Sequence, residues 1–488
     1  MFCRKNNLCS SAKFILFYKG LILRKLFCIC LTWEKTAWCK GKTKVKAFYF
    51  LTRGGTMNNG DIREKIAFPD YDVVVAGAGL AGVAAAIAAA REGMRVLVVE
   101  RYGFAGGMAT GALVNPFMNY FESGANGKLV NKGLFETFRK DMQALGATKY
   151  AEKRGCHAFN DELLKIVLDR EMAKNGVDVL YHALLSDVSV KDGKINFVTV
   201  STISGNFDIK AKFFIDATGN ADLTAFAGLE FRLGRENDNR VQPLTLCFRL
   251  SGVDESKLDV RLINEKYAQM RREGRIRNKR EDVLLFNFRD VDCGEGLIHF
   301  NTTRILEKNP VSALERSAAE IEAREQVLEM VEFLKNNFEC MKNAYLVNMA
   351  AETGIRESRR IVGLYEITAS DIVNARKFDD SIARGSYEID IHSPDGTGTH
   401  HVRLKEGEYY TIPYRAMVPV AAVNLLAAGR PLSSTHEAHA AFRVMPITTC
   451  IGEAAGVAAA LAVKKGVSAA LVPVPELREK LVGYGALI

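Results

Sequence analysis

Residues 71–100 read YDVVVAGAGLAGVAAAIAAAREGMRVLVVE, and this stretch decides the fold class. Its first part, residues 72–76, is a short β-branched run of the kind found in buried parallel strands. Residues 80–91 are rich in alanine and predict a helix, and residues 95–99 predict a second strand. A strand, a helix and a second strand in this order predict an α/β fold with a Rossmann-like unit.

Three glycines connect the first strand to the helix, and an acidic residue follows the second strand. Gly77, Gly79 and Gly82 form the pattern GxGxxG. The first glycine permits a tight turn, the second lets the backbone approach a pyrophosphate, and the third lets the helix pack close to the strand. Glu100 stands where an acid accepts ribose hydroxyls, and the helix start directs free N–H groups at the phosphates. The stretch therefore predicts a dinucleotide-binding site.

A second glycine pair indicates FAD rather than NAD. Residues 104–110 read FAGGMAT, whereas NAD-binding domains normally continue directly into the next strand–helix unit. A glycine pair here lets the backbone lie against a longer cofactor. Residues 213–222, FFIDATGNAD, contain another expected strand that ends in an ATG turn. Both segments resemble the FAD-binding half of the glutathione-reductase-type flavoproteins, although Asn220 replaces the more usual Asp.

Two further segments carry a closer resemblance. Residues 413–456 read PYRAMVPVAAVNLLAAGRPLSSTHEAHAAFRVMPITTCIGEAAG, and residues 354–363 read GIRESRRIVG. Together they resemble the bacterial FAD-dependent oxidoreductase family, which is distantly similar to the fumarate reductase and succinate dehydrogenase flavoproteins and to the flavin subunit of heterodisulfide reductase. The resemblance covers most of residues 70–465. The cysteine clusters of the heterodisulfide reductase branch are missing, and a second GxGxxG unit for NAD(P) is not visible.

The motifs and the resemblance imply FAD as the cofactor. The predicted cofactor-binding residues are Gly77, Gly79, Gly82, Glu100, Arg101, Gly106, Gly107, Thr110, Gly219, Gly429 and Thr448. A helix is expected at residues 447–464, with Pro446 suited to its first turn. In this class of fold its positive end lies against the flavin pyrimidine and stabilises an anionic reduced flavin. Its small residues, including Gly452 and Gly456, are expected to pack closely on the sheet.

The segment before this helix holds the predicted catalytic residues. By resemblance, residues 436–443 face the isoalloxazine, and Arg443 lies where fumarate-reductase-type enzymes place a carboxylate-binding arginine. Because imidazole titrates nearest neutral pH, His436 or His439 is predicted to be the acid or base, and Arg443 to anchor an anionic substrate or developing negative charge. The alternative is that the histidines only hold loop carbonyls.

Two other polar clusters leave alternatives open. Arg356, Arg359 and Arg360 contact the substrate or a cofactor phosphate, or else form ion pairs with Glu352 and Glu357. A second cluster is explained by a polar turn or by a metal ion, and a metal is not predicted. Its members are Asp390, His392, Asp395, His400 and His401.

The charge divides the chain into unlike parts. The formal charge is +9, yet residues 1–56 contain 12 Lys and Arg and one acid, so the remainder is near neutral. Residues 1–56 are therefore expected to be a non-native or disordered leader. Residues 57–229 and 405–488 are predicted to form a split FAD-binding domain. Residues 230–404 are predicted to form an inserted mixed α+β substrate domain.

The function predicted from these features is FAD-dependent oxidoreduction, with a hydride transferred between flavin N5 and a small molecule, anionic or carbohydrate-derived. A tRNA-modifying flavoprotein and an electron-carrying FAD protein without a small substrate are the alternatives. The near-neutral chain after the leader argues against a nucleic-acid partner, because phosphate binding needs clustered Lys and Arg. No membrane partner is expected, and the five cysteines after the leader, which are widely spaced, fit a cytoplasmic protein. The external electron donor or acceptor and the oligomeric state are not specified by the sequence.

Overall fold

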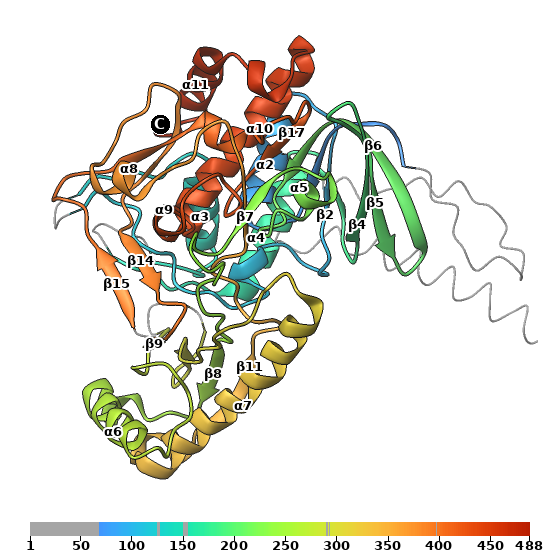
Figure 1. The fold of residues 1–488 in the computed structure, drawn as a ribbon. Coiled ribbons are helices and arrows are strands. Elements are labelled where there is room, and N and C mark those ends of the chain that lie inside the picture. The colour runs from blue at the N-terminus through green and yellow to red at the C-terminus, as the bar shows by residue number, and fades with distance from the viewer. Residues whose placement is uncertain (1–67, 124–126, 150–154, 289–290, 292, 397) are drawn as a thin grey trace, which may run out of the picture. The chain divides into compact units, whose positions relative to one another are not determined.

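In the computed structural model, helices pack beside a mixed β-sheet (Figure 1). The predicted leader, residues 1–56, lies outside the described residues. The residues that the structure describes are 68–123, 127–149, 155–288, 291, 293–396 and 398–488.

A seven-stranded mixed sheet carries the predicted Rossmann-like unit, in the order β3-β2-β1-β6-β5-β4, with β17 also paired to β6. The first three strands, β6 and β17 run parallel, while β4, β5 and β6 form an antiparallel meander. The strands are β1 (Tyr71–Ala76), β2 (Val96–Val99), β3 (Asp178–Leu180), β4 (Leu184–Lys191), β5 (Lys194–Thr202), β6 (Gly205–Asp216) and β17 (Leu425–Ala427). The α/β fold predicted from residues 71–100 is thus confirmed.

Strand β6 is longer than the sequence suggests. Its first half pairs with β5, and its second half, from Ala211 to Asp216, pairs with β1. The meander and the strand before the ATG turn are therefore one continuous strand. The polar alternation of the exposed half and the apolar run of the buried half give the two halves different sequence patterns.

Two helices with small residues pack together beside the sheet, α2 (Leu80–Arg91) and α10 (Met445–Lys465) (Figure 1). A Cβ atom on Gly452 would lie 2.0 Å from the Ala81 carbonyl oxygen, and one on Gly456 would lie 2.1 Å from that of Ala85. The expectation that these glycines pack on the sheet is therefore wrong, because they face helix α2. Helix α10 alone among the described helices is long and apolar enough to cross a membrane, and 94% of its most apolar window is buried in this core.

Shorter helices accompany the core that β1, α2 and α10 form. Helix α4 (Asp161–Lys174) follows Asn160, whose side chain accepts hydrogen bonds from the backbone N–H groups of Glu162 and Leu163 and so fixes the helix start. The other short helices in this part of the structure are α3 (Leu134–Ala144), α5 (Asp222–Phe226), α8 (Ala369–Val373), α9 (His436–Phe442) and α11 (Val474–Gly483).

A second hydrophobic core lies between residues 244 and 355. An antiparallel sheet in the order β11-β8-β10-β9 packs there with two helices, which form the lower part of the molecule in Figure 1. These elements are β8 (Phe248–Ser251), β9 (Leu285–Asn287), β10 (Ile298–Phe300), β11 (Tyr345–Met349), α6 (Val260–Arg272) and α7 (Ala313–Asn337). Apolar residues from Ile367 to Val418 pack instead in the first core, which contains residues of β1, α2 and α10. The domain boundaries at residues 230 and 404 stay a prediction.

The other six described strands between residues 231 and 413 form three two-stranded ribbons. They are β7 (Phe231–Leu233) with β12 (Arg359–Ile361), β13 (Ser381–Gly385) with β16 (Tyr410–Pro413), and β14 (Ile389–His392) with β15 (Thr399–Val402).

A buried carboxyl group makes stability depend on pH. Glu453, in the middle of α10, is 1% exposed and accepts a hydrogen bond from the Leu134 N–H at 2.9 Å. Burial raises the pKa of this carboxyl from its ordinary 4.5 to about 7. The native state therefore binds more protons than the unfolded state between these values, and stability falls as the pH rises through that window.

We expect denaturant unfolding to show a loss of about 3 kcal/mol between pH 4.5 and pH 7 from this group. A Glu453→Gln variant keeps an oxygen for the Leu134 N–H and should lose this part of the pH dependence. An unchanged pH profile in the variant would contradict the assignment.

Candidate active site

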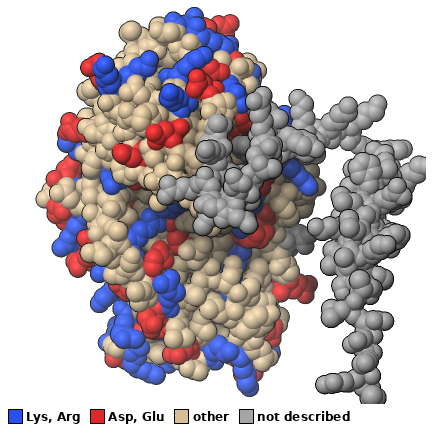
Figure 2. Space-filling model, turned by 90° about the vertical axis from the view of Figure 1, so that its right-hand side faces the viewer, with Lys and Arg blue, Asp and Glu red and all other residues tan. Residues whose placement is uncertain are grey.

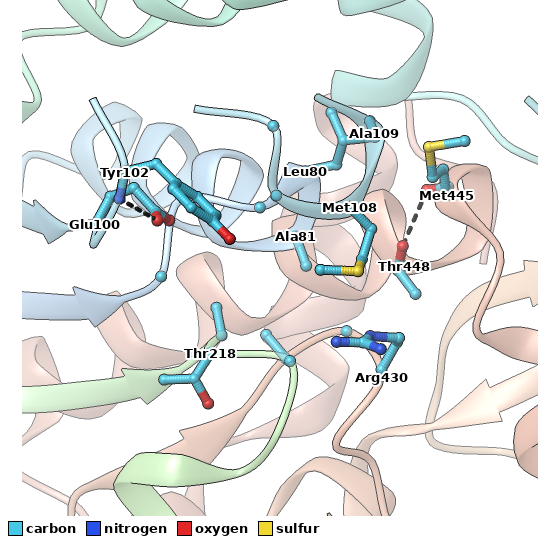
Figure 3. Close-up of a pocket in the computed structure, with 18 of the residues that line it drawn as sticks. Leu80, Ala81, Glu100, Tyr102, Met108, Ala109, Thr218, Arg430, Met445 and Thr448 are labelled. Atoms are coloured by element: carbon cyan, nitrogen blue, oxygen red, sulfur yellow. Dashed lines mark hydrogen bonds between the residues drawn. The ribbon is translucent and has the colours of Figure 1, made fainter. Parts of the chain in front are cut away.

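A cleft lies where the parallel strands end. Gly77 follows β1, Glu100 follows β2, Ala217 follows β6 and Ala428 follows β17, and all four residues line the cleft. The carboxyl ends of parallel strands are the usual place for a ligand in this class of fold. Figure 3 shows the side chains around it. Its lining residues are Gly77, Gly79, Leu80, Ala81, Glu100, Arg101, Tyr102, Gly106, Gly107, Met108, Ala109, Ala217, Thr218, Gly219, Glu352, Ala428, Gly429, Arg430, Arg443, Met445 and Thr448.

The glycines of the cleft bring backbone segments into direct contact. A Cβ atom on Gly77, which has a φ of +98°, would lie 2.5 Å from the Ala217 carbonyl oxygen. A Cβ atom on Gly107, with a φ of +55°, would lie 2.9 Å from the Gly79 Cα. Side chains at these positions would separate the segments, so a bare backbone surface faces the cleft. This surface fits a pyrophosphate, which needs close approach to backbone N–H groups.

The acid after β2 is held rigidly at the cleft. Glu100 is 6% exposed and accepts hydrogen bonds from the N–H groups of Ala78 at 2.7 Å and Tyr102 at 3.0 Å. Burial raises the pKa of its carboxyl. Next to it, Arg101 forms an ion pair with Glu352, which also pairs with Arg316 of helix α7. This ion-pair network connects the cleft wall to the second core.

Most of the predicted cofactor-binding residues meet in this one cleft. Gly82 and Thr110 do not line it. A Cβ on Gly82 would lie 1.9 Å from the Gly77 carbonyl oxygen, and the Thr110 hydroxyl donates to the Ala105 carbonyl at 2.8 Å. These two therefore support the shape of neighbouring backbone. The residues brought together are Gly77, Gly79, Glu100, Arg101, Gly106, Gly107, Gly219, Gly429 and Thr448.

The start of helix α10 forms one end of the cleft. Met445 and Thr448 line it, and Pro446 occupies the first turn as predicted. The Thr448 hydroxyl donates to the Met445 carbonyl at 3.1 Å (Figure 3). Free N–H groups at this helix start provide positive potential beside whatever the cleft binds there.

Arg430 is a cleft residue that the sequence reasoning missed. Its side chain reaches into the cleft opposite Met108 (Figure 3) and hydrogen-bonds the Ile355 carbonyl. Burial lowers the pKa of its guanidinium to about 10, and none of the ion pairs among the described residues includes it. A buried, unpaired cation here fits an anionic group such as a cofactor phosphate. Its position directly after β17 was the available signal.

A second cavity adjoins the cleft. The two share four lining residues, Met108, Arg430, Arg443 and Met445. The other residues that line the second cavity are Val114, Pro116, Met118, Thr245, Cys247, Asn301, Gly354, Ile355, Arg356, Tyr387, Asp390, His392 and Val444. They come from both hydrophobic cores, so the cavity lies where the cores meet.

Of the predicted catalytic residues, only Arg443 lines these cavities. His436 is 3% exposed, and its Nδ1 lies 2.8 Å from a Glu357 oxygen. His439 is 1% exposed, and burial, with Arg360 nearby, holds the pKa of its imidazole well below 6.5. Neither histidine lines a described cavity, and their catalytic roles stay predictions.

The three crowded arginines separate into different environments. Arg359 pairs with Asp222 at 2.8 Å, and Arg360 pairs with Glu357. Arg356 instead donates to the Pro243 carbonyl at 2.8 Å and to the Thr245 hydroxyl at 2.5 Å, and it lines the second cavity. Ion pairing explains the first two arginines but not Arg356.

Part of the polar turn also belongs to the second cavity. Asp390 and His392 line it, whereas Asp395, His400 and His401 do not. Tyr387 lies beside them and donates its hydroxyl hydrogen to Asp390 Oδ2 at 2.9 Å. The sequence indicated a polar turn or a metal site for the acid and the histidine, and it gave no signal for Tyr387.

Two curated relatives match part of the chain. Over 192 residues it is 30% identical to the tRNA uridine 5-carboxymethylaminomethyl modification enzyme MnmG of Streptococcus agalactiae, covering 37% of this chain and 29% of that enzyme. Over 184 residues it is 28% identical to the thiamine thiazole synthase of Aeropyrum pernix, covering 34% of this chain and 63% of that enzyme. The matched region thus spans less than two thirds of either relative.

Solved structures match most of the chain at low identity. A geranylgeranyl bacteriochlorophyll reductase-like protein from Thermoplasma acidophilum matches with a TM-score of 0.47 and 14% identity. That match covers 86% of this chain and 84% of the chain of that protein. The p-nitrophenol 4-monooxygenase PnpA from Pseudomonas putida matches with a TM-score of 0.42 and 13% identity, and the match covers 86% of this chain and 87% of the monooxygenase chain. Similarities at this level carry no inference about a substrate.

The family comparison covers nearly all of the described chain. The family model described as FAD dependent oxidoreductase matches residues 72–481. This range includes every residue that lines the cleft and the second cavity. The chain belongs to the FAD dependent oxidoreductase family, and it is an FAD-binding oxidoreductase.

Proposed function

We propose that this oxidoreductase binds a small substrate in the second cavity and transfers a hydride between that substrate and N5 of FAD. The observation that carries the proposal is the shared wall of Met108, Arg430, Arg443 and Met445. A ligand in the second cavity lies against these residues, and so does a ligand in the cleft. Such an arrangement supports direct transfer between two neighbouring ligands.

The cleft residues hold FAD by complementary chemistry. The backbone at Gly79 and Gly107 would hold the pyrophosphate, and Glu100 would accept ribose hydroxyls. Arg430 would supply a positive charge, and the start of α10 would add positive potential. When bound, FAD supplies a two-electron donor or acceptor, and the protein supplies binding and orientation.

Asp390 is the group best placed to take a proton from the substrate. It is 7% exposed and lines the second cavity, and its Oδ1 atom is buried without a hydrogen-bond partner. Its Oδ2 accepts from Tyr387, and Arg443 Nη2 lies 3.8 Å from that atom. In the oxidative direction, Asp390 accepts the proton of a substrate hydroxyl or amine as the hydride leaves the adjacent carbon. In the reductive direction it returns that proton.

The proposal places the acid–base role on Asp390 instead of His436 or His439. Both histidines lie outside the walls of the cavity, and a proton donor or acceptor must be within hydrogen-bond reach of the substrate. The predicted role of Arg443 is retained, because this residue lines both cavities.

The test is anaerobic reduction of the purified yellow protein. We expect the flavin absorbance to bleach with at least one compound from a panel of hydroxy acids, amines and sugars, or the reduced flavin to be reoxidised by an enoate. NAD(P)H should reduce it slowly, because no second dinucleotide motif is visible in the sequence. Rapid reduction by NAD(P)H alone, with no effect of any other compound, would contradict the proposal.

The surface gives little support to the tRNA-modifying alternative. On the face drawn in Figure 2, positive and negative side chains are intermixed over the described residues. Nucleic-acid binding relies on clustered cations. The partial match to a tRNA-modifying enzyme covers only 37% of this chain.

A further inference from the structure

The second cavity contains a buried arginine without an acidic partner. Arg356 donates to a carbonyl and a hydroxyl, and its Nη2 lies 3.5 Å from Asn301 Oδ1. These three partners are neutral, and no ion pair among the described residues includes Arg356. A buried charge without an opposite charge is costly, so a ligand that supplies one should bind strongly.

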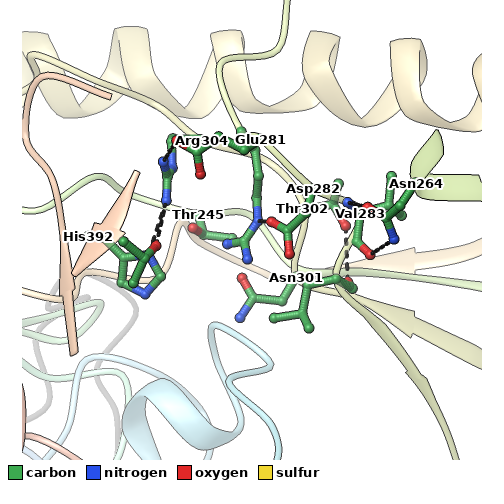
Figure 4. Close-up of polar contacts among 12 residues, drawn as sticks. Thr245, Asn264, Glu281, Asp282, Val283, Asn301, Thr302, Arg304 and His392 are labelled. Carbon is green, nitrogen blue, oxygen red and sulfur yellow. Dashed lines mark hydrogen bonds and ion pairs between the residues drawn. The ribbon is translucent and has the colours of Figure 1, made fainter. Parts of the chain in front are cut away.

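Neighbouring arginines do have acidic partners. Arg304 contacts Glu281 at 3.3 Å, and its Nη2 lies 3.1 Å from His392 Nδ1 (Figure 4). Arg280 pairs with Asp282 at 2.8 Å. Thr245 and Asn301, which contact Arg356, lie in the same region as Arg304 and His392 (Figure 4). Arg356 therefore differs from Arg304 and Arg280, and it shares the lack of an acidic partner with Arg430 on the wall next to the cleft.

The titratable groups that line the second cavity give a simple charge balance. Arg356 and Arg443 are positive, and Asp390 is negative. Burial and the surrounding arginines hold the pKa of His392 well below 6.5, so this residue is neutral at pH 7. Tyr387 and Cys247 are neutral because burial raises both of their pKa values. Arg430 and Arg443 both lie on the shared wall; with Arg430 assigned to the cofactor and Arg443 to the substrate, as proposed above, the substrate side has a formal charge of about +1.

Most of the remaining wall is apolar. The apolar residues of this wall are Met108, Val114, Pro116, Met118, Ile355, Val444 and Met445. A ligand that fills the cavity should therefore have one anionic end and an apolar body.

We infer that the substrate is a small monocarboxylate with an apolar body, and that Arg356 binds its carboxylate. This inference rests on the proposed function, because it concerns the same cavity. A guanidinium presents paired N–H donors that match the two oxygens of a carboxylate. Arg356 thus positions the substrate. Arg443 lies on the wall shared with the cleft, and Asp390 lies beside Arg443.

The electrostatics of the cavity walls agree with this assignment. Burial, followed by repulsion from Arg443, Arg280 and Arg304, lowers the pKa of Arg356 to about 9. Asp390 opposes this effect only in part. A bound carboxylate would restore the ordinary preference for the charged guanidinium.

The test compares an acid with its neutral amide on the FAD-loaded protein. Benzoate and benzamide are titrated while changes in the flavin absorbance spectrum and the heat of binding are recorded. We expect benzoate to bind at least about 30-fold more tightly than benzamide, and succinate, a dianion, to bind no more tightly than benzoate. Equal binding of benzoate and benzamide would overturn the inference.

Variants identify the residue responsible. Arg356→Gln should weaken the binding of benzoate about 100-fold and leave the binding of benzamide nearly unchanged. Arg356→Lys should restore part of the affinity for benzoate. Arg359→Gln is the matched control, because Arg359 pairs with Asp222 and does not line the cavity. An equal loss in both Gln variants would contradict the role of Arg356.

Binding and redox turnover separate this inference from the proposed function. Selective benzoate binding without flavin reduction by any compound would support the carboxylate site and count against substrate oxidation. Reduction of the flavin by neutral compounds as readily as by their acid counterparts would support the proposed function and overturn the carboxylate inference.

Discussion

An Asp390→Asn variant is expected to reduce the rate of anaerobic flavin bleaching by a substrate by about 10²- to 10⁴-fold. The carboxylate of Asp390 is buried at the cavity wall, and its Oδ1 has no hydrogen-bond partner. Asparagine has nearly the same shape and still accepts the Tyr387 hydrogen bond, but it does not accept a proton at neutral pH. Stopped-flow absorbance at saturating substrate measures the loss.

The control for this substitution is Glu388→Gln. Glu388 lies two positions away on the chain, contacts His401 and Arg403, and does not line the cavity. Its substitution should leave the bleaching rate within about twofold of the wild-type rate, because it removes only partly exposed ion pairs. If Asp390→Asn changes the substrate Kd but not the rate at saturation, then Asp390 binds the substrate and is not the base.

A Gly79→Ala variant is expected to fold normally and to lose FAD. The backbone at Gly79 has a φ of −63° and a ψ of 172°, which alanine adopts without strain. A Cβ atom there would meet no described protein atom closer than the Gly107 Cα at 3.9 Å. The methyl group would therefore stand in the cleft where the backbone must approach the pyrophosphate. We expect FAD affinity to fall about 100-fold, or about 2.7 kcal/mol.

The measurement is FAD content after purification, followed by titration of the apoprotein with FAD. The melting temperature of the apoprotein should match that of wild-type apoprotein within about 2 °C. Gly483→Ala serves as a control, because a Cβ on Gly483 would meet nothing within 4 Å and the residue lies away from the cleft. Full retention of FAD by the Gly79→Ala variant would contradict the proposed orientation of the cofactor.

The sequence predicted the parts of the site that depend on local backbone. GxGxxG, the glycine pair at residues 106–107 and the acid at Glu100 each follow a strand end, so their position is set by a few neighbouring residues. The helix predicted at residues 80–91 matches α2. Such patterns can be read from sequence because turn, cap and strand geometry are local.

The second cavity could not be predicted in this way. Cys247, Arg356 and Asp390 lie far apart in the chain and meet only when the two cores pack together. Arg356 looked like its neighbours Arg359 and Arg360, because all three lie near acidic residues in sequence. The difference among them is which side chain faces an acid in space, and tertiary packing alone determines that.

The sequence also could not predict which element packs against the glycine face of α10. Gly452 and Gly456 predict close approach, because a missing side chain leaves room for another backbone. Nothing in their spacing says whether that backbone is a strand or a helix. The alanines of α2 present an equally smooth surface, and two smooth helices pack more closely than a helix on a sheet of β-branched side chains.

The wall shared by the two cavities also couples the two ligands of the proposed function. Met108, Arg430, Arg443 and Met445 line both the cleft and the second cavity, so a ligand on one side contacts side chains that a ligand on the other side also contacts. Substrate affinity is thereby linked thermodynamically to cofactor occupancy, and the linkage is reciprocal. We therefore expect a bound substrate to slow the escape of FAD. Protein that has lost FAD should thus regain it more completely in the presence of the substrate than in buffer alone.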